Sequence, residues 1–172
     1  MTEPAHSLAT ARLRLRIPRT DDGAFLVRLM NDPDWLRYIG DRNVRSEDAA
    51  AAYVEQRMLP SFREQGFGMY VVETLARGDA VGICGLVKRP TLTDLDLGFA
   101  FLPEQRGHGY AVEAGTAVLA DARERLGAQR VLAITTPDNE ASARVLARLG
   151  MACAGERSLD GERSLRLYEW NG

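Results

Sequence analysis

The sequence predicts a single α/β domain with a mixed sheet, on three observations. Its 172 residues are 45% hydrophobic and 27% charged, which suits one domain with a sizeable core. The spacing of apolar residues changes along the chain between the alternation of strands and the period of helices. In the second half, a helical segment lies between two strand-like ones, which predicts a parallel pair joined by a crossover within an otherwise antiparallel sheet. We therefore expect residues 1–172 to form one domain with about seven strands and four main helices.

The first part of the chain predicts one strand and two helices. Residues 12–17 alternate between arginine and aliphatic side chains, which is typical of a half-buried strand. Thr20 is placed to cap a short helix that ends at residues 31–33, Asn-Asp-Pro. Ser46 is placed to cap a second helix that continues to about Glu64.

The rest of the chain predicts an antiparallel meander followed by alternating helices and strands. Turn residues separate three strand-like runs at residues 68–74, 80–88 and 94–102. Apolar periodicity and terminating glycines then predict a helix at 110–126, a strand at 130–136 and a helix at 138–149. Two closing strands are expected to join at Asp160-Gly161.

The charge balance argues against general nucleic-acid binding. With 22 basic and 24 acidic residues, the chain has a formal net charge of −2 and no excess of cations to attract phosphate backbones. The arginine stripe of Arg12, Arg14 and Arg16 keeps an RNA-binding module open as a weaker alternative. Alternation favours the simpler interpretation, in which this stripe is the solvated face of a strand.

The cysteines, histidines and hydropathy argue against a disulfide-rich protein, a metalloprotein and a membrane-spanning protein. Cys84 and Cys153 lie sixty-nine positions apart and His6 and His108 are the two histidines, so we expect no disulfide framework and no metal centre. The longest apolar run, residues 80–87, is far shorter than the ~20 residues of a membrane span. We expect a cytoplasmic protein without a membrane partner.

A glycine-containing loop between a predicted strand and the long helix carries the first chemical signal. Gly107 and Gly109 allow a tight turn whose N–H groups, together with the helix N-terminus, would form an anion cradle. The simpler interpretation is a turn without function. A P-loop is excluded because no lysine is near, and the dinucleotide fingerprint is weak because Val112 occupies the third glycine position.

Two motifs carry a resemblance to a known family. Residues 106–111, Arg-Gly-His-Gly-Tyr-Ala, resemble the Arg/Gln-x-x-Gly-x-Gly/Ala signature of the GNAT superfamily of N-acetyltransferases, whose loop wraps the pyrophosphate of acetyl-CoA. Residues 139–142, Asn-Glu-Ala-Ser, followed by Leu-Gly-Met at 149–151, resemble the Asn-x-x-Ser/Ala…Leu-Gly-Phe segment of the same superfamily. Residues 11–16 and 31–33 are similar to the N-terminal segments of the Rim-type branch of the family, which acetylates ribosomal-protein N-termini. The resemblance covers about residues 10–170.

The resemblance implies the GNAT fold and acetyl-CoA as cosubstrate. In the family, the strand before the loop splays from the next parallel strand, and the pantetheine arm fills the gap. Implied coenzyme contacts are the main chains of Phe99, Ala100 and Phe101, the loop residues Arg106, Gly107, His108, Gly109, Tyr110, Ala111 and Val112, and Asn139 and Ser142. We expect the His108 imidazole to flank the phosphates rather than to act as a base.

Asp96 and Ser142 are the candidate catalytic residues. Asp96 falls where several relatives place a glutamate base, and burial would have to raise its pKa from the ordinary value of about 3.9. Being shorter, the aspartate favours a water relay; the alternative is a solvated strand residue beside Asp94. Many relatives carry a tyrosine acid where this chain has Leu146. Ser142 shares that helix face and is assigned to hydrogen bonding near the coenzyme sulfur, the alternative being an ordinary first-turn serine.

The predicted function is N-acetylation of a primary amine, on a protein N-terminus or a small molecule, by direct attack in a ternary complex. The family implies that aromatic residues of the helical half and second strand wall the acceptor side: Trp35, Tyr38, Tyr53 and Tyr70. The alternative for each is a place in the core. A non-catalytic acyl-CoA-binding regulator is the second functional hypothesis, kept open by Leu146, and a homodimer is possible.

Overall fold

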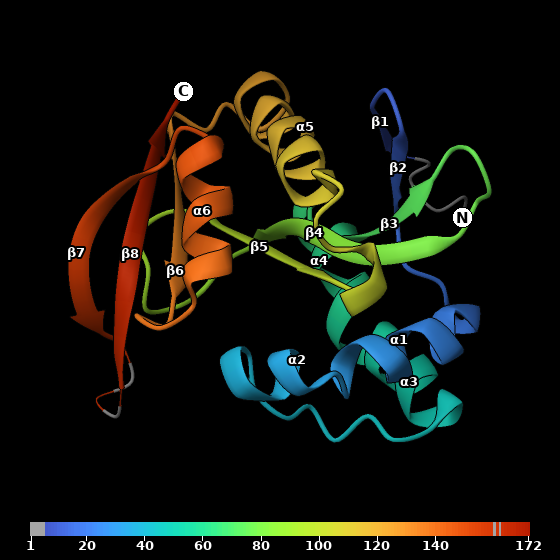
Figure 1. The fold of residues 1–172 in the computed structure, drawn as a ribbon. Coiled ribbons are helices and arrows are strands. Elements are labelled where there is room, and N and C mark those ends of the chain that lie inside the picture. The colour runs from blue at the N-terminus through green and yellow to red at the C-terminus, as the bar shows by residue number, and fades with distance from the viewer. Residues whose placement is uncertain (1–5, 160, 162) are drawn as a thin grey trace.

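The computed structural model describes residues 6–159, 161 and 163–172. The mixed α/β sheet that the sequence predicts is confirmed, with eight strands among these residues (Figure 1). The strands are β1 Leu8–Ala9, β2 Leu13–Arg16, β3 Met69–Thr74, β4 Ala80–Val87, β5 Asp96–Phe101, β6 Arg130–Thr135, β7 Ala152–Ser158 and β8 Ser164–Asn171. Asp160, where the last hairpin was expected to turn, lies outside the described residues.

Helices lie between the strands. They are α1 Gly23–Met30, α2 Pro33–Tyr38, α3 Glu47–Tyr53, α4 Leu59–Gln65, α5 Tyr110–Glu124 and α6 Glu140–Arg148. A π-helical segment, Val54–Met58, joins α3 to α4, and short 3-10 turns cover Thr20–Asp22 and Pro103–Gln105. Among the described residues, no helix is both long and apolar enough to cross a membrane.

One parallel pair interrupts an antiparallel sheet. The strand order is β1-β2-β3-β4-β5-β6-β8-β7, and every pair is antiparallel except β5 and β6. The meander β3-β4-β5 and the crossover from β5 through α5 to β6 are therefore confirmed. β5 pairs with β4 along its whole length but pairs with β6 only between Asp96 and Leu132. The sheet consequently opens between β5 and β6.

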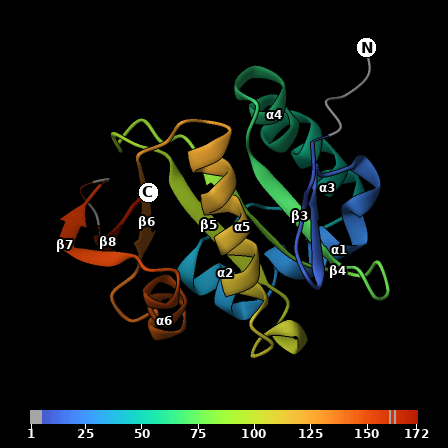
Figure 2. The same cartoon turned by 90° about the horizontal axis from the view of Figure 1, so that it is seen from above.

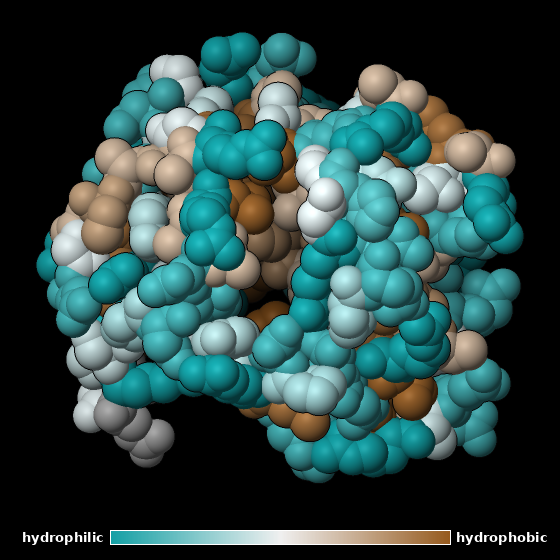
Figure 3. All heavy atoms as spheres, viewed as in Figure 1, coloured by the Kyte–Doolittle hydropathy of each residue, from teal (hydrophilic) through white to brown (hydrophobic). Residues whose placement is uncertain are grey.

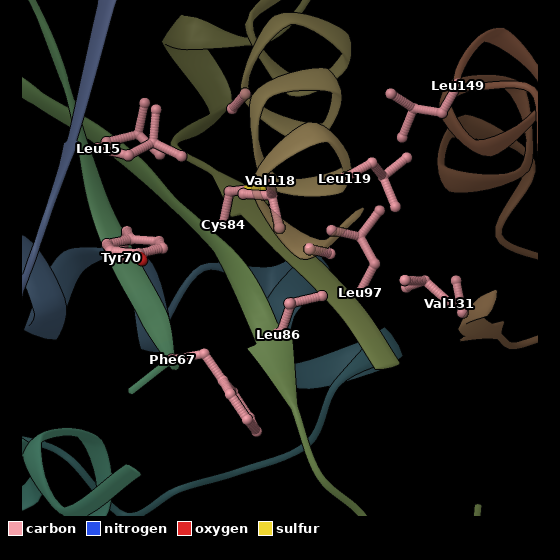
Figure 4. Close-up of a cluster of buried hydrophobic side chains, with 14 of the residues drawn as sticks. Leu15, Phe67, Tyr70, Cys84, Leu86, Leu97, Val118, Leu119, Val131 and Leu149 are labelled. Atoms are coloured by element: carbon pink, nitrogen blue, oxygen red, sulfur yellow. The ribbon is translucent and has the colours of Figure 1, made fainter. Parts of the chain in front are cut away.

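Helices cover both faces of the sheet. α5 lies over β4 and β5 on one face, with α6 beside β6, whereas α1, α2 and α3 lie on the opposite side (Figures 1 and 2). The core has two parts, one on each face. Figure 4 shows the first, in which Val118 and Leu119 of α5 face strand residues such as Leu86 and Leu97. The second packs α1 and the α3–α4 segment against Val71 and Ile83.

Three local features differ from the expectations. The short strand β1 and the helix α2 were not expected. The expected Thr20 cap is wrong because α1 begins at Gly23, and the Asp22 carboxylate accepts the Arg19 N–H at 2.7 Å instead. The Ser46 cap is confirmed, since its hydroxyl accepts the Ala49 N–H at 3.1 Å. The helix that it starts contains the π-helical segment, a feature often found at functional sites.

Close packing at Gly85 predicts a stability effect. A Cβ there would lie 2.0 Å from the Gly68 carbonyl oxygen and 2.8 Å from the Met69 Cα. Gly85→Ala should therefore lower the free energy of unfolding by about 1–3 kcal/mol, measured by urea denaturation. Gly98, its cross-strand partner, is the matched control, because a Cβ there would meet only the flexible Met69 side chain at 3.4 Å. Equal urea midpoints for Gly85→Ala and Gly98→Ala would contradict this account.

Candidate active site

A cavity of about 800 Å³ lies where the sheet opens. Its lining comes from β5 and β6, from the loop before α5, from α6, and from α2 and the π-helical segment on the other face. Figure 3 shows a hollow on this side of the molecule, with apolar side chains inside and polar side chains around its rim. Its volume is in the range of small-molecule and cofactor sites.

The edge of β5 that faces the cavity offers main-chain hydrogen-bonding groups. Beyond Asp96, β5 has no ladder partner on the β6 side within the described residues. Phe99, Ala100 and Phe101 line the cavity from this unpaired stretch. Main-chain groups alternate between the two neighbouring strands, so Ala100 faces Ile83 of β4, and the Phe101 carbonyl accepts from Arg106. An amide-containing ligand in the gap would satisfy the N–H and C=O groups of Phe99 and the N–H of Phe101 as a neighbouring strand does.

The loop before α5 directs main-chain N–H groups to the same cavity. Gly107 and Gly109 both have φ of +79°, and Gly109 is the N-cap of α5. No side chain caps this helix, so the N–H groups of its first turn, which have no intrahelical partner, are available to a ligand. Tyr110, Ala111 and Val112 of that turn line the cavity. The helix dipole favours an anion at this position.

Asp96 is a buried carboxylate at the closed end of the gap. It is 1% exposed and lines the cavity, so the interpretation as a solvated strand residue is wrong. Arg89 Nε donates to its Oδ2 at 2.5 Å, and its Oδ1 is buried without a hydrogen-bond partner among the described residues. Burial raises the pKa of Asp96 to about 6, against the opposing effect of Arg89. This pKa suits a group that accepts a proton near neutral pH.

The family comparison matches this geometry. The model of the acetyltransferase (GNAT) domain matches residues 12–152 of the chain. The chain belongs to the GNAT acetyltransferase family. Acetyltransferases of this family use acetyl-CoA, and acetylation of amines is their general reaction.

Individual relatives agree. The chain is 31% identical over 149 residues to YkkB of Bacillus subtilis, an uncharacterised protein, and the match covers 84% of each. An acetyltransferase from Agrobacterium tumefaciens has a TM-score of 0.83 at 23% identity, covering 100% of this chain and 98% of that one. The ribosomal-protein-S5-alanine acetyltransferase of Vibrio fischeri has a TM-score of 0.79 at 17% identity, covering 96% of both chains. At such identities the two structures support the fold, and the Rim-type branch stays a prediction.

Arg106 of the GNAT loop connects the two sides of the cavity. Its Nε donates to the Phe101 carbonyl at 3.1 Å. Its terminal nitrogens donate to Asp32 at 2.7 Å and to Asp34 at 2.6 Å. The guanidinium thus holds the start of α2 against the loop, and the predicted contact of Arg106 with the coenzyme would have to come from its main chain or after these bonds break.

His108 lies on the outside of the loop. It does not line the cavity, unlike the residues on either side of it. Its ring stacks on Tyr110 at 5.4 Å between centroids, and its Nδ1 lies 3.0 Å from the Gln105 carbonyl oxygen. A place on the outer side agrees with the prediction that His108 is not the base, and its contact with phosphates stays a prediction.

Helix α6 brings Asn139 and Ser142 to the cavity, as the motif implies. Both line it, and the Asn139 side chain caps the helix by accepting the Ser142 N–H at 3.2 Å. Asn139 therefore has a structural role whatever it binds. Leu146 also lines the cavity but is 1% exposed and packs in the core. A buried leucine cannot donate a proton to a leaving group.

The predicted acceptor residues divide between the cavity and the core. Trp35, Tyr38 and Tyr53 line the cavity. Trp35 is largely buried there, and its Nε1 donates to the Gly40 carbonyl at 3.0 Å. The assignment of Tyr70 to the acceptor side is wrong: it is 2% exposed, packs against Phe62 in the core on the α5 face, and does not line the cavity.

The arginine stripe of β2 is neutralised. Arg14 and Arg16 both pair with Glu73, and Arg12 pairs with Glu113 at 2.6 Å. Glu113 joins the start of β2 to the first turn of α5, and these pairs hold its pKa and that of Glu73 below their ordinary values. The arginines that motivated the RNA-binding alternative are thus paired with carboxylates of the chain itself.

Several polar cavity residues were missed by sequence reasoning, among them Arg89, Arg57 and Thr135. Arg89 was placed in a turn, but it reaches Asp96 because the β4–β5 register sets Val87 opposite Asp96. Arg57 comes from the π-helical segment, and Thr135 ends β6 with its hydroxyl buried and without a partner in the described part of the chain. These positions depend on long-range pairing, which no local pattern reveals.

Proposed function

We propose that this GNAT protein transfers the acetyl group of acetyl-CoA to a primary amine, on a protein N-terminus or a small molecule, while both are bound. One observation carries the proposal. A single cavity joins the N–H groups at the start of α5 to the buried Asp96 carboxylate, through the gap between β5 and β6. An anion-binding turn and a proton acceptor are the two elements that this reaction needs in one place.

The chain fits the coenzyme. The first-turn N–H groups of α5 would hold its pyrophosphate, and the unpaired edge of β5 would bind its amide-bearing arm. The Thr135 hydroxyl, which has no hydrogen-bond partner among the described residues, offers the coenzyme a further hydrogen-bonding position along the cavity. When bound, acetyl-CoA supplies the acetyl thioester that the amine attacks.

Asp96 accepts the proton of the amine, directly or through a water molecule. With a pKa of about 6 it is mostly ionised at pH 7. An α-amino group, with a pKa of about 7.7–8.0, is partly neutral at that pH, whereas a lysine amine near 10.4 is almost wholly charged. The base therefore favours an α-amino group or another amine of low pKa.

The departing thiolate leaves without a tyrosine acid. Leu146 occupies that position, and we assign Ser142, which lines the cavity from α6, to hydrogen bonding near the thiolate. Cys84 and Cys153 both lie among the described residues, and neither lines the cavity. Burial raises the pKa of the Cys84 thiol to about 12, so Cys84 stays protonated and is not a nucleophile at neutral pH. The lack of a cysteine nucleophile among the described cavity residues supports direct transfer without an acetylated enzyme.

Release of free thiol from acetyl-CoA tests the proposal against the regulatory alternative. We expect thiol release to increase when an amine from a panel of peptides and small amines is added. Tight coenzyme binding without any acceptor-stimulated release would instead support a non-catalytic acyl-CoA-binding regulator.

Ser142→Ala should weaken the use of acetyl-CoA without unfolding the protein. Loss of one hydrogen bond of about 0.5–1.5 kcal/mol predicts a KM for acetyl-CoA about 2- to 12-fold higher. Asn139→Ala is the matched comparison, since it removes the α6 cap and should lower the free energy of unfolding by about 1 kcal/mol. Initial rates and thermal melts separate the two effects. An unchanged KM in Ser142→Ala would remove this serine from the site.

A further inference from the structure

The cavity is strongly cationic although the chain is slightly acidic. Seven arginines and three aspartates line it, whereas the whole chain has a formal net charge of −2. Positive charge concentrated in a cleft attracts anions. The coenzyme phosphates account for only part of this charge, because the arginines come from both faces of the sheet.

Several of these arginines already have a partner. Arg106 pairs with Asp32 and Asp34 at the start of α2. Arg89 uses its Nε for Asp96. On the coenzyme side, Arg144 lies 3.9 Å from Glu140 within α6, where Arg148 also lines the cavity.

Arg42 and Arg57 are different. Within the described residues, neither side chain is paired with a carboxylate. Arg57 comes from the π-helical segment and Arg42 from the loop after α2, so both belong to the helical layer opposite α5 and α6. Tyr38 and Tyr53 line the cavity from the same layer. Two unpaired guanidinium groups on this wall are available to a ligand other than the coenzyme.

We infer that the acceptor is a primary amine carrying a carboxylate near its amino group, and that Arg57 and Arg42 bind this carboxylate. The inference rests on the proposed function and specifies its substrate class. Guanidinium groups pair with carboxylates through two parallel hydrogen bonds, which would fix the position of the amine as well as attract it. A cationic acceptor would be repelled by the same wall.

Arg89 makes an anionic acceptor compatible with the Asp96 base. A carboxylate beside an isolated Asp96 would repel it, but the ion pair offsets the aspartate charge. The hydrogen bond to Asp96 uses only Arg89 Nε, and a guanidinium has four further N–H donors. Arg89 therefore separates the acceptor carboxylate from the base while leaving Asp96 Oδ1 open to the amine.

Matched peptides test the inference. Ser-Glu-Glu amide and Ser-Gln-Gln amide have similar terminal amines and differ in carboxylates. We expect kcat/KM about tenfold higher for the acidic peptide, equivalent to about 1.4 kcal/mol, with the preference falling as salt screens the charges. L-glutamate is the second arm: preference for it over both peptides would identify a free amino acid as the source of the carboxylate, whereas preference for the acidic peptide would identify a peptide N-terminus.

Arginine variants locate the effect. In the double variant Arg57→Gln/Arg42→Gln, KM for the acidic peptide should rise about tenfold, so that the preference for the acidic peptide over the Gln peptide is lost. Arg77→Gln is the control: this arginine is 81% exposed, pairs with Asp79 in the β3–β4 turn and does not line the cavity. The same removal of charge there should leave the preference intact.

The outcomes separate the inference from the proposed function. Equal kcat/KM for the two peptides, or a preference that survives in Arg57→Gln/Arg42→Gln, would overturn the carboxylate inference while leaving acetyl transfer in place. If no amine is acetylated, the proposed function fails. The carboxylate inference is then tested by binding alone, with calorimetric titration of each peptide into protein loaded with coenzyme A. Tighter binding of the acidic peptide that is lost in the double variant supports it; equal binding overturns it.

Discussion

Asp96→Asn should lower kcat at pH 8 by about 10²- to 10⁴-fold, the range typical of a lost general base, with little change in the affinity for acetyl-CoA. The amide keeps the size and planar shape of the carboxylate but cannot accept the proton. Steady-state rates of thiol release at saturating amine measure the effect. Unchanged turnover would remove Asp96 from the mechanism.

Asp94→Asn is the matched control. Asp94 lies two residues away, outside the cavity, where hydrogen bonds from Arg130 and Thr93 hold its pKa below the ordinary value. We expect kcat of Asp94→Asn within twofold of the wild type. A loss as large as that of Asp96→Asn would indicate a general effect of charge on this strand.

The pH dependence gives an independent readout of the same carboxylate. Because the base must be ionised and its pKa is about 6, wild-type kcat should fall about tenfold at pH 5 relative to its plateau. Below pH 6, log kcat/KM should fall with slope two, since the amine and Asp96 both become protonated. In Asp96→Asn only the slope of one from the amine should remain.

The raised pKa of Asp96 also predicts how the free energy of unfolding changes with pH. It is raised from 3.8 to about 6 in the fold, so the protonated form is the one that folding favours. That contribution is complete below about pH 4 and is lost as the pH rises through about 6. The free energy of unfolding of the wild type, relative to Asp96→Asn, should therefore decrease over this interval. An increase would contradict the burial of an ionisable Asp96.

Ala111→Asp should abolish coenzyme binding while the protein stays folded. Ala111 is in the first turn of α5 and lines the cavity. A carboxylate about 4 Å from a phosphate is opposed by on the order of 4 kcal/mol at an effective dielectric constant near 20, so the Kd for coenzyme A should rise at least ~100-fold. The same carboxylate interacts favourably with the helix dipole, which limits any loss of stability. Calorimetric titration measures the Kd.

Ala111→Asn separates charge from size. The neutral amide has nearly the same shape, so its Kd should stay well below that of Ala111→Asp. If both variants bind coenzyme A equally well, or if Ala111→Asp binds like the wild type, the phosphates do not lie at the N-terminus of α5.

Local patterns predicted most of the fold. Alternation at residues 12–17 and the cap at Ser46 depend on neighbours in sequence, and both are observed. Residues 31–33 were predicted to end the first helix, and α1 does end at Met30. It was not expected that Pro33 would also begin α2, with the Asp32 carboxylate accepting the Trp35 N–H at 3.4 Å. Proline is compatible with the first helical position because the N–H it lacks has no partner there.

The candidate site was predicted less completely. The motifs placed Gly107, Gly109 and Asn139 at the cavity or beside it, because each acts through local backbone geometry. The burial of Asp96 and its pairing with Arg89 depend on the β4–β5 register and on the helical layer above, which the sequence does not encode locally. Tyr70 is an aromatic residue of a type often found in binding sites, but its side chain packs in the core on the α5 face.

Initial rates with acetyl-CoA and an amine varied together test most directly whether one cavity holds donor and acceptor at the same time. The account predicts intersecting double-reciprocal lines, with free coenzyme A and N-acetylated amine formed in equal amounts. Parallel lines, typical of an acetylated enzyme, or coenzyme release that does not respond to the amine, would contradict it.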